Sequence, residues 1–232
     1  TDPLADKIEE FIDETILLAI ANEHQSGRRL FVGTTNLDAQ RFVIWNMGAI
    51  AASGHPESLE LFRKVLLASA SIPVAFPPVY IEVEVDGRRY DEMHVDGGVI
   101  SELFLWGAMV DIAAARREFQ EDSQQPIQVE IYVIRNSQID PAAKQIKPRL
   151  TNNASRSLLT LLKAVAIGDL QRIWLLAQRN QVDFNYVGIP PEHAETPTGA
   201  FEPPDMRRLF EIGRKIALSP EPWRKEPPSW VR

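Results

Sequence analysis

Residues 79–98 have the sequence VYIEVEVDGRRYDEMHVDGG, and their pattern predicts a β-hairpin. Two runs of alternating apolar and polar side chains, 79–85 and 88–95, flank the pair Asp86-Gly87, which favours a type I′ turn. The second run ends at Asp96, which two adjacent glycines follow. We therefore expect the chain to leave the sheet at this point and to present Asp96 at the end of a strand.

Apolar periodicity on either side of the hairpin predicts alternating helices and strands. Upstream we expect a helix from Asp2-Pro3 to just before Gly27, strands over 30–35 and 42–45 joined by a turn at 36–38, and a helix over 57–70. Downstream we expect a helix over 102–118, a strand over 127–134, a helix over 154–179, a strand over 182–187 and a helix over 205–217 capped by Asp205. Such alternation is typical of an α/β fold with a partly parallel sheet.

The composition is that of one ordinary globular domain and excludes several classes of function. Of the 232 residues, 44% are apolar and 25% are charged, which suffices for one full core. The net charge of -7 argues against nucleic acid as a partner, because binding phosphates requires a basic surface. The chain has no cysteine and four scattered histidines, so we expect neither a thiolate nor a histidine metal site.

The sequence contains no signal peptide and no apolar run long enough to cross a membrane. Because the chain starts at Thr1 and not at methionine, we expect a processed or truncated product. The compartment stays open, with cytoplasmic and membrane-peripheral locations as alternatives.

Most catalytic signatures are missing from the sequence. No Gly-Lys pair exists for a phosphate-binding loop, and no glycine set or His-Glu-x-x-His matches a dinucleotide or zinc motif. A Gly-x-Ser-x-Gly nucleophile elbow requires two glycines four positions apart, and no two glycines have that separation. Taken by itself, the triplet Asp96-Gly97-Gly98 is a weak signal and favours a structural turn.

Two other segments of the sequence favour a functional interpretation of this triplet. Gly-Thr-Thr at 33–35, Ala-Ser-Ala-Ser-Ile-Pro-Val-Ala-Phe-Pro-Pro at 68–78 and Asp-Gly-Gly at 96–98 follow one another in an order that resembles the C-terminal part of the patatin-like phospholipase family. The resemblance covers roughly residues 25–135 well. It implies a three-layer α/β fold with a mostly parallel central sheet, present as its C-terminal portion over 1–190, with a C-terminal helix and a proline-rich tail of the same domain over 191–232.

The resemblance also implies a function. That family consists of lipid acyl hydrolases with a serine–aspartate dyad, and its aspartate maps onto Asp96, with Gly97 and Gly98 completing the motif. Its serine lies in an elbow earlier in the family's chain, so we expect this chain to be the C-terminal portion of such an enzyme, with the serine upstream of Thr1. The intact parent would be a lipid ester hydrolase, whereas the activity of this chain alone stays open. No cofactor or metal is implied.

The chemistry of the dyad explains the motif. A serine hydroxyl needs a base to take its proton, and a partly desolvated carboxylate can be that base. We expect Gly97 and Gly98 to turn the backbone away with positive φ and to leave room for serine and substrate.

Other residues near the motif have simpler expected roles. We expect His94 to be a packed histidine, and Ser69 and Ser71 to be helix-end hydroxyls that bond the backbone. Thr34, Thr35 and Asn36 would end a strand, with turn formation as the default role and a place near the site as the alternative. Asp91 and Glu92 would be exposed charges of the hairpin. Two alternatives stay open: a non-catalytic lipid-binding or scaffolding relative of the fold, and a hydrolase that uses a serine of its own.

The apolar positions of the helix expected over 154–179 cover most of its circumference. It would either be buried between a sheet and its neighbours or cover an acyl groove and contact lipid. A half-fold would also expose apolar patches, so we expect self-association or binding of the missing N-terminal half. The expected small-molecule partner is a lipid or phospholipid ester, a membrane surface is a further alternative, and nucleic acid is not expected.

Overall fold

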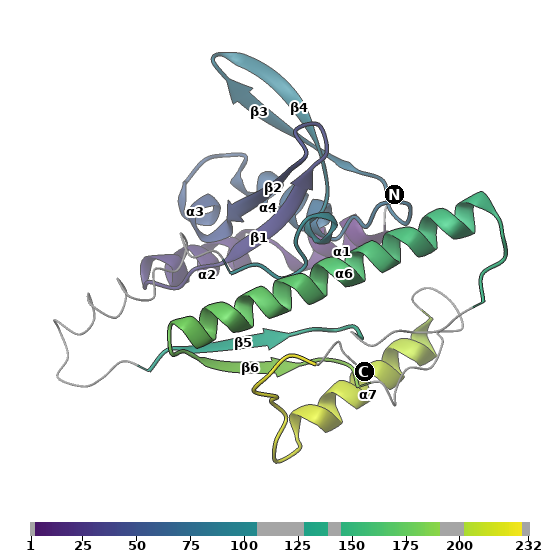
Figure 1. Ribbon diagram of the computed structural model, residues 1–232. Helices are drawn as coiled ribbons and strands as arrows, with labels where there is room; N and C mark the ends of the chain where they lie inside the picture. Colours follow the sequence, from purple (N-terminus) through teal and green to yellow (C-terminus); the bar gives the residue numbers. More distant parts are fainter. Residues whose placement is uncertain (1–2, 106–127, 139–144, 191–201, 229–232) are drawn as a thin grey trace. The chain divides into compact units, whose positions relative to one another are not determined.

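The computed structural model describes residues 3–105, 128–138, 145–190 and 202–228. The chain divides into two compact units, Thr1–Glu102 (unit 1) and Leu103–Arg232 (unit 2) (Figure 1). Most of the helix expected over 102–118 lies outside the described residues, and residues 102–105 are not helical. The expected division of the chain at residue 190 stays a prediction.

Four helices belong to unit 1. The single helix expected before Gly27 is wrong: the structure has α1, Pro3–Phe11, and α2, Glu14–Gln25. The break occurs because Asp13 acts as an N-cap, its side chain accepting the N–H of Ile16 at 2.9 Å. A short helix that periodicity did not predict, α3 (Met47–Ala52), follows the second strand and is capped by the Asn46 side chain. The expected helix over 57–70 is confirmed as α4, Ser58–Ser69.

The sheet of unit 1 has the order β2-β1-β4-β3, and every neighbouring pair is antiparallel. Its strands are β1 (Phe31–Asn36), β2 (Arg41–Asn46), β3 (Val79–Val85) and β4 (Arg88–Asp96). The predicted hairpin is confirmed, with φ of 52° at Asp86 and 73° at Gly87, as a type I′ turn requires. The expected mostly parallel sheet is not confirmed, because the short β1–β2 and β3–β4 connections permit only antiparallel pairing.

Helix α4 packs against β1, β3 and β4 and closes the core of unit 1. Its apolar face contributes Phe62, Val65 and Ala68, spaced three residues apart, which meet Met47 and Ile81. This core covers one face of the sheet and fixes the strands whose ends form the site described below.

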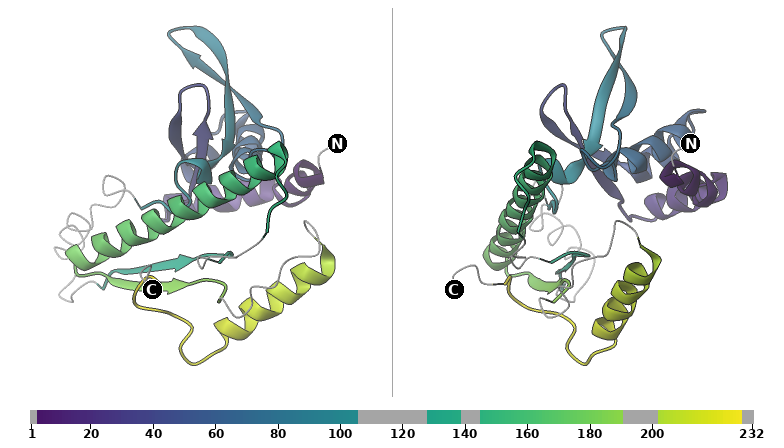
Figure 2. Two further views of the ribbon diagram at one scale, coloured as in Figure 1. Left: turned by 45° about the vertical axis from the view of Figure 1, so that its right-hand side comes forward. Right: turned by 90° about the vertical axis from the view of Figure 1, so that its right-hand side faces the viewer.

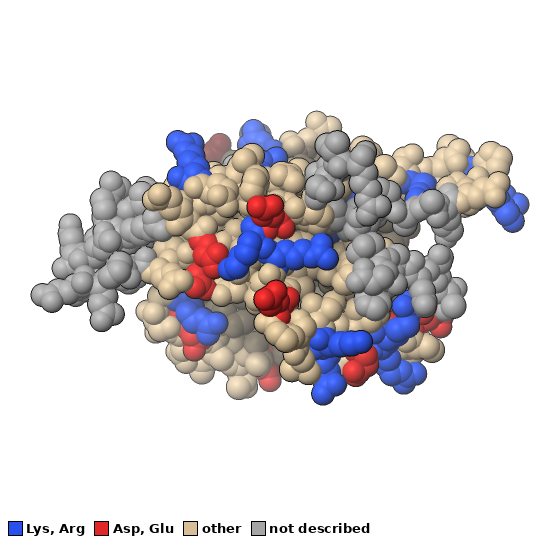
Figure 3. All heavy atoms as spheres, turned by 60° about the horizontal axis from the view of Figure 1, so that its bottom comes forward, with Lys and Arg blue, Asp and Glu red and all other residues tan. Residues whose placement is uncertain are grey.

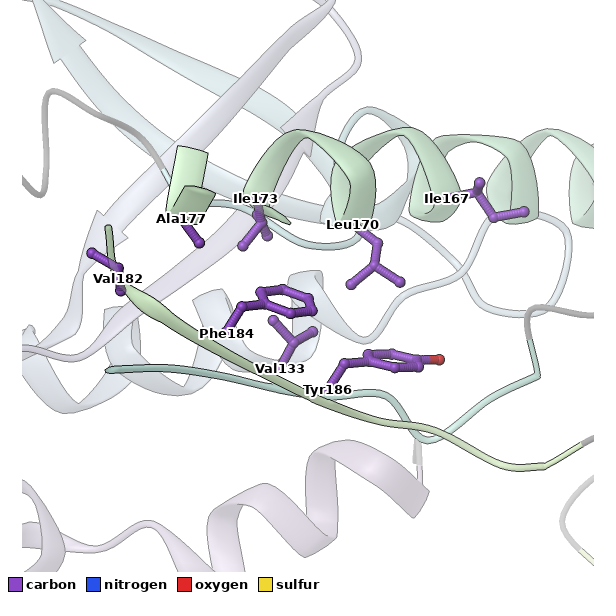
Figure 4. Close-up of a cluster of buried hydrophobic side chains, with 8 residues drawn as sticks. All are labelled: Val133, Ile167, Leu170, Ile173, Ala177, Val182, Phe184 and Tyr186. Carbon is purple, nitrogen blue, oxygen red and sulfur yellow. The ribbon is translucent and has the colours of Figure 1, made fainter. Parts of the chain in front are cut away.

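Unit 2 contains the single parallel strand pair of the described residues, β5 (Glu130–Ile134) with β6 (Asp183–Val187). The long connection between these strands includes α6, Leu150–Arg179, as a parallel pair requires. Side chains of α6 point onto β5 and β6 in Figure 4, where Leu170 and Ile173 meet Phe184 and Tyr186. The α/β class is thus confirmed.

The expectation that the long helix is buried holds for only part of its length. All buried residues of α6 lie between Ala166 and Ala177, whereas Leu159 and Leu161 in its N-terminal half are exposed. Figure 2 shows from two further sides how α6 runs along the strand pair.

The C-terminal segment adds to the edge of β6. Arg224 and Tyr186 exchange two backbone hydrogen bonds of 2.8 Å each, and Trp223 contacts Tyr132 edge-on with ring centroids 4.9 Å apart. The Lys225 ammonium donates to both carboxylate oxygens of Asp183, at 2.7 and 3.0 Å. These contacts hold residues 223–225 of the proline-rich tail against β5 and β6.

The last helix is α7, Pro203–Ala217. The expected cap at Asp205 is wrong, because two prolines occupy the first helical positions and the N-cap residue is Glu202, without a side-chain cap bond. Asp205 lies in the first turn, where the helix dipole favours an acid.

Candidate active site

Asp96 is the last residue of β4 and is held on both sides by backbone contacts. In the register of the sheet it pairs with Thr34 of β1. On its other side, the Asp96 N–H donates to the carbonyl of Ser71, 3.0 Å away, in the segment that follows α4. After Asp96 the chain enters a short 3-10 turn, Gly97–Val99. The Cα position of Asp96 is therefore fixed from two directions, as the sequence predicted for a strand end.

The Asp96 carboxylate is half-buried, and burial dominates its electrostatics. Removal from water raises the pKa of this carboxyl above its ordinary value, while the N–H of Gly98, 2.7 Å from Oδ1, works in the opposite direction. Within the described part of the chain no basic side chain pairs with Asp96, and Oδ2 accepts no hydrogen bond. The second carboxylate oxygen is thus available to take a proton.

The two glycines have a different role from the expected one. Neither Gly97 nor Gly98 has a positive φ, so the prediction of a left-handed turn is wrong. Instead the site lacks space: a Cβ on Gly97 would lie 2.6 Å from the carbonyl oxygen of Gly33, and one on Gly98 would lie 3.0 Å from Oδ1 of Asp96. The glycines allow β1 and the carboxylate to approach the turn closely.

A buried chain of hydrogen bonds joins β1, β2 and β4 immediately before Asp96. The Trp45 indole donates to Thr34 Oγ1 at 2.8 Å, which lies 2.9 Å from Nδ1 of His94, and Nε2 of His94 lies 3.2 Å from the carboxylate of Glu92. Because indole N–H can only donate, the hydroxyl of Thr34 is free to donate to Nδ1, and the ring then donates from Nε2 to Glu92. His94 is fully buried and confirmed as a packed histidine.

Sequence patterns had missed Thr34 and Trp45 as members of this network. Thr34 was expected to form a turn, yet the turn starts two residues later, where Asn36 Oδ1 accepts the N–H of Ala39 at 2.9 Å. Asp38 then accepts the N–H of Met93 at 2.7 Å and ties this turn to β4. The available signal was a hydroxyl inside an otherwise apolar strand, since a buried hydroxyl requires partners.

Ser71 is nearly fully buried, and its hydroxyl donates to the carbonyl of Leu67 at 2.7 Å. This confirms it as a helix-end hydroxyl and leaves it poorly placed as a nucleophile. The turn that follows is strained: Val74, an exposed β-branched residue, has φ of 73°. Strain of this kind concentrates at functional sites, and here it lies three residues from the carbonyl that holds Asp96.

The described residues show neither a metal centre nor a membrane span. No group of three or more His, Asp or Glu side chains is placed to bind a metal ion in residues 3–105, 128–138, 145–190 and 202–228. Among the same residues, none of the helices is long and apolar enough to span a bilayer.

A comparison with family models supports the resemblance seen in the motifs. Residues 2–109 match the model described as "Patatin-like phospholipase". The matched range nearly coincides with unit 1 and includes every residue around Asp96. No curated protein and no solved structure matches the chain. The family match supports a function of the lipid-hydrolase type in general.

Proposed function

We propose that this chain, which belongs to the patatin-like phospholipase family through residues 2–109, supplies the aspartate of a serine–aspartate dyad that hydrolyses carboxylic esters of lipids. The observation that carries the proposal is the Asp96 carboxylate, which is half-buried, has no cationic partner among the residues that the structure describes, and has its pKa raised by its burial. The serine would lie outside these 232 residues, since they contain no Gly-x-Ser-x-Gly. The three-layer arrangement with a mostly parallel central sheet belongs to the same proposal.

The geometry suits Asp96 to act as a general base. A raised pKa brings the carboxylate closer to the range in which it can take and return a proton during turnover. The hydroxyl of the serine would lose its proton to Oδ2 as its oxygen attacks the ester carbonyl, and Asp96 would return that proton to the leaving alcohol. A water molecule, deprotonated by the same carboxylate, would then attack the acyl carbon and release the fatty acid. As the bond from the acyl carbon to the serine oxygen breaks, Asp96 would return the proton to that oxygen. Oδ1 would stay bonded to Gly98 throughout.

The partners that follow from this proposal are a lipid or phospholipid ester and the segment that carries the serine. Self-association is the alternative way to complete the fold.

The test is Asp96→Asn in the protein that contains this chain, with ester hydrolysis as the readout. Loss of the base should lower kcat about 10²–10⁴-fold while the thermal unfolding curve stays cooperative. Asp91→Asn is a matched control, because Asp91 is exposed on the same strand and should keep full activity. Hydrolysis by Asp96→Asn at nearly the normal rate would refute the role of Asp96.

A second candidate, a non-catalytic lipid-binding or scaffolding relative, is favoured by the missing elbow. A fluorophosphonate probe separates the two, because it labels only an activated serine. Labelling of a protein in which a serine elbow accompanies this chain supports the dyad, and failure of any form to react supports the binding module. Labelling within the 232 residues themselves would identify a resident serine. The hydrogen bond from the Ser71 hydroxyl to the Leu67 carbonyl argues against Ser71 in that role.

A further inference from the structure

The apolar residues of helix α7 form one continuous arc, of which one edge is partly buried and the rest is exposed. Ile212 and Ile216, four residues apart, lie at the partly buried edge. Met206, Leu209 and Phe210 lie on a neighbouring stripe and are exposed, with Met206 53% and Phe210 69% accessible. Gly213 and Ala217 continue this outward stripe at helical spacing. The stripe defined by residues 206, 209, 210, 213 and 217 has no covering element among the described residues.

The charges on α7 differ from those of the chain as a whole. The helix has four basic and two acidic side chains, in a protein whose net charge is -7. At 100° per residue, Arg207 and Arg214 fall on the edge of the stripe next to Phe210, and both are exposed. Glu211 lies beyond them and forms an exposed ion pair of 3.6 Å with Arg214, so the border on the Phe210 side carries two basic groups and one acidic group.

We propose that α7 is an interfacial helix that docks this stripe into the surface of an anionic lipid bilayer. Helices that lie in the membrane interface combine an apolar face containing Phe or Leu with a basic polar face, and bury the former about 5–10 Å deep. Phe210, Leu209 and Met206 would enter the acyl boundary, and Arg207 and Arg214 would contact the headgroups. The charge of the border fits anionic headgroups in particular.

A second copy of the chain fits this stripe less well. A stable protein interface involves roughly 20–30 residues on each side, whereas the stripe offers three large side chains, which a glycine and an alanine follow along the helix. On the face drawn in Figure 3, basic side chains lie in small groups beside acidic ones and do not form one broad basic field.

The test is sedimentation of the 232-residue chain with vesicles of phosphatidylcholine, with and without phosphatidylserine. We expect binding to the anionic vesicles that weakens at high salt, because salt screens the headgroup contacts. Phe210→Asp should weaken binding roughly ten- to hundredfold, the value of burying one large apolar side chain. The double variant Arg207→Glu/Arg214→Glu should bind anionic vesicles no better than neutral ones.

Matched controls carry the same changes elsewhere. Val85→Asp replaces an exposed apolar residue at the hairpin turn, and Arg41→Glu/Arg88→Glu changes two exposed basic residues. Both controls should bind like the unaltered chain. Absence of binding by the unaltered chain, or equal weakening by the controls, would overturn the proposal.

Gel filtration supplies the remaining outcome. If Phe210→Asp turned an oligomer into a monomer and left vesicle binding unchanged, the stripe would be a contact between copies and the proposal would fail. The inference does not depend on catalysis: Asp96→Asn should bind vesicles normally, so failure of the dyad and failure of the lipid surface give different results.

Discussion

Asp96 and Asp183 each stand at an end of a strand, yet their surroundings move their carboxyl pKa values in opposite directions. Burial raises the pKa of Asp96, with only the N–H of Gly98 opposing it. The pKa of Asp183 is lowered, first by the hydrogen bond from Lys225 and also by the charge of that ammonium. Partial desolvation of Asp183 works in the opposite direction, but the contacts of its carboxylate outweigh it.

The difference teaches how one residue type serves two purposes. A carboxylate with a cation at 2.7 Å is held in its charged form and fastens the C-terminal segment to β6. A carboxylate removed from water without a cation retains an affinity for protons, as a general base requires. Three experiments can sharpen or break this contrast between the Asp96 site and unit 2, and they follow in order of expected effect.

The largest effect should come from Gly97→Ala. The new methyl group would lie 2.6 Å from the backbone oxygen of Gly33, which cannot move without disturbing β1, so the free energy of unfolding should fall by about 3 kcal/mol. Gly168→Ala in α6 is the control: its methyl group meets open space in a helix interior and should raise stability by about 0.5–1 kcal/mol. Urea denaturation of both variants checks this, and a harmless Gly97→Ala would refute the close approach.

Thr34→Val should have the next largest effect. Valine keeps the shape of threonine but leaves the Trp45 indole and His94 Nδ1 without a partner, at a cost of about 1–3 kcal/mol. The neighbouring Thr35→Val removes a single long contact, 3.4 Å from the carbonyl of Gly97, and should cost less than about 1 kcal/mol. Equal losses of unfolding free energy in the two variants would show that the buried network contributes nothing specific.

The smallest effects are those of pH, and their signs are the informative part. The folded protein binds a proton at Asp96 more tightly than the unfolded chain does, so the contribution of Asp96 is present in acid and lost as the pH rises through its raised pKa. At Asp183 the folded protein binds the proton less tightly, so that contribution is present near neutrality and lost as the pH falls through its lowered pKa.

Asparagine at either position removes the titration. From about pH 2 to about pH 7, the stability of Asp96→Asn relative to the unaltered chain should rise, and that of Asp183→Asn should fall. Urea denaturation across this range measures both slopes. Parallel slopes would mean that the two carboxylates do not differ in the way described.

The sequence was a good guide wherever local chemistry determines structure. Asp86-Gly87 specified the turn type, alternation located β3 and β4, and the strand end at Asp96 followed from its two glycines. Prediction failed where a single side chain competes with a longer pattern: Asp13 interrupts a helix that apolar spacing would continue.

Sequence patterns did not predict which segments lie close together in the folded chain. Nothing local indicates that Gly33 would lie against Gly97, so the need for glycine was attributed to backbone φ when its cause is space. Likewise, the partners of Thr34 come from β2 and β4, and only the register of the completed sheet brings them together.

The pairing of β1 with β4 also has a consequence for how the protein folds. Each hairpin closes over a few residues and can form early, whereas the Thr34–His94 contact joins residues sixty positions apart and must wait for a much longer loop to close. Asp96 gains its burial and its fixed position only at that later step. In a newly made chain, the Asp96 carboxylate would therefore stay solvated like that of an ordinary aspartate until the two hairpins pack together. It would acquire the surroundings of the proposed base only when the sheet is complete.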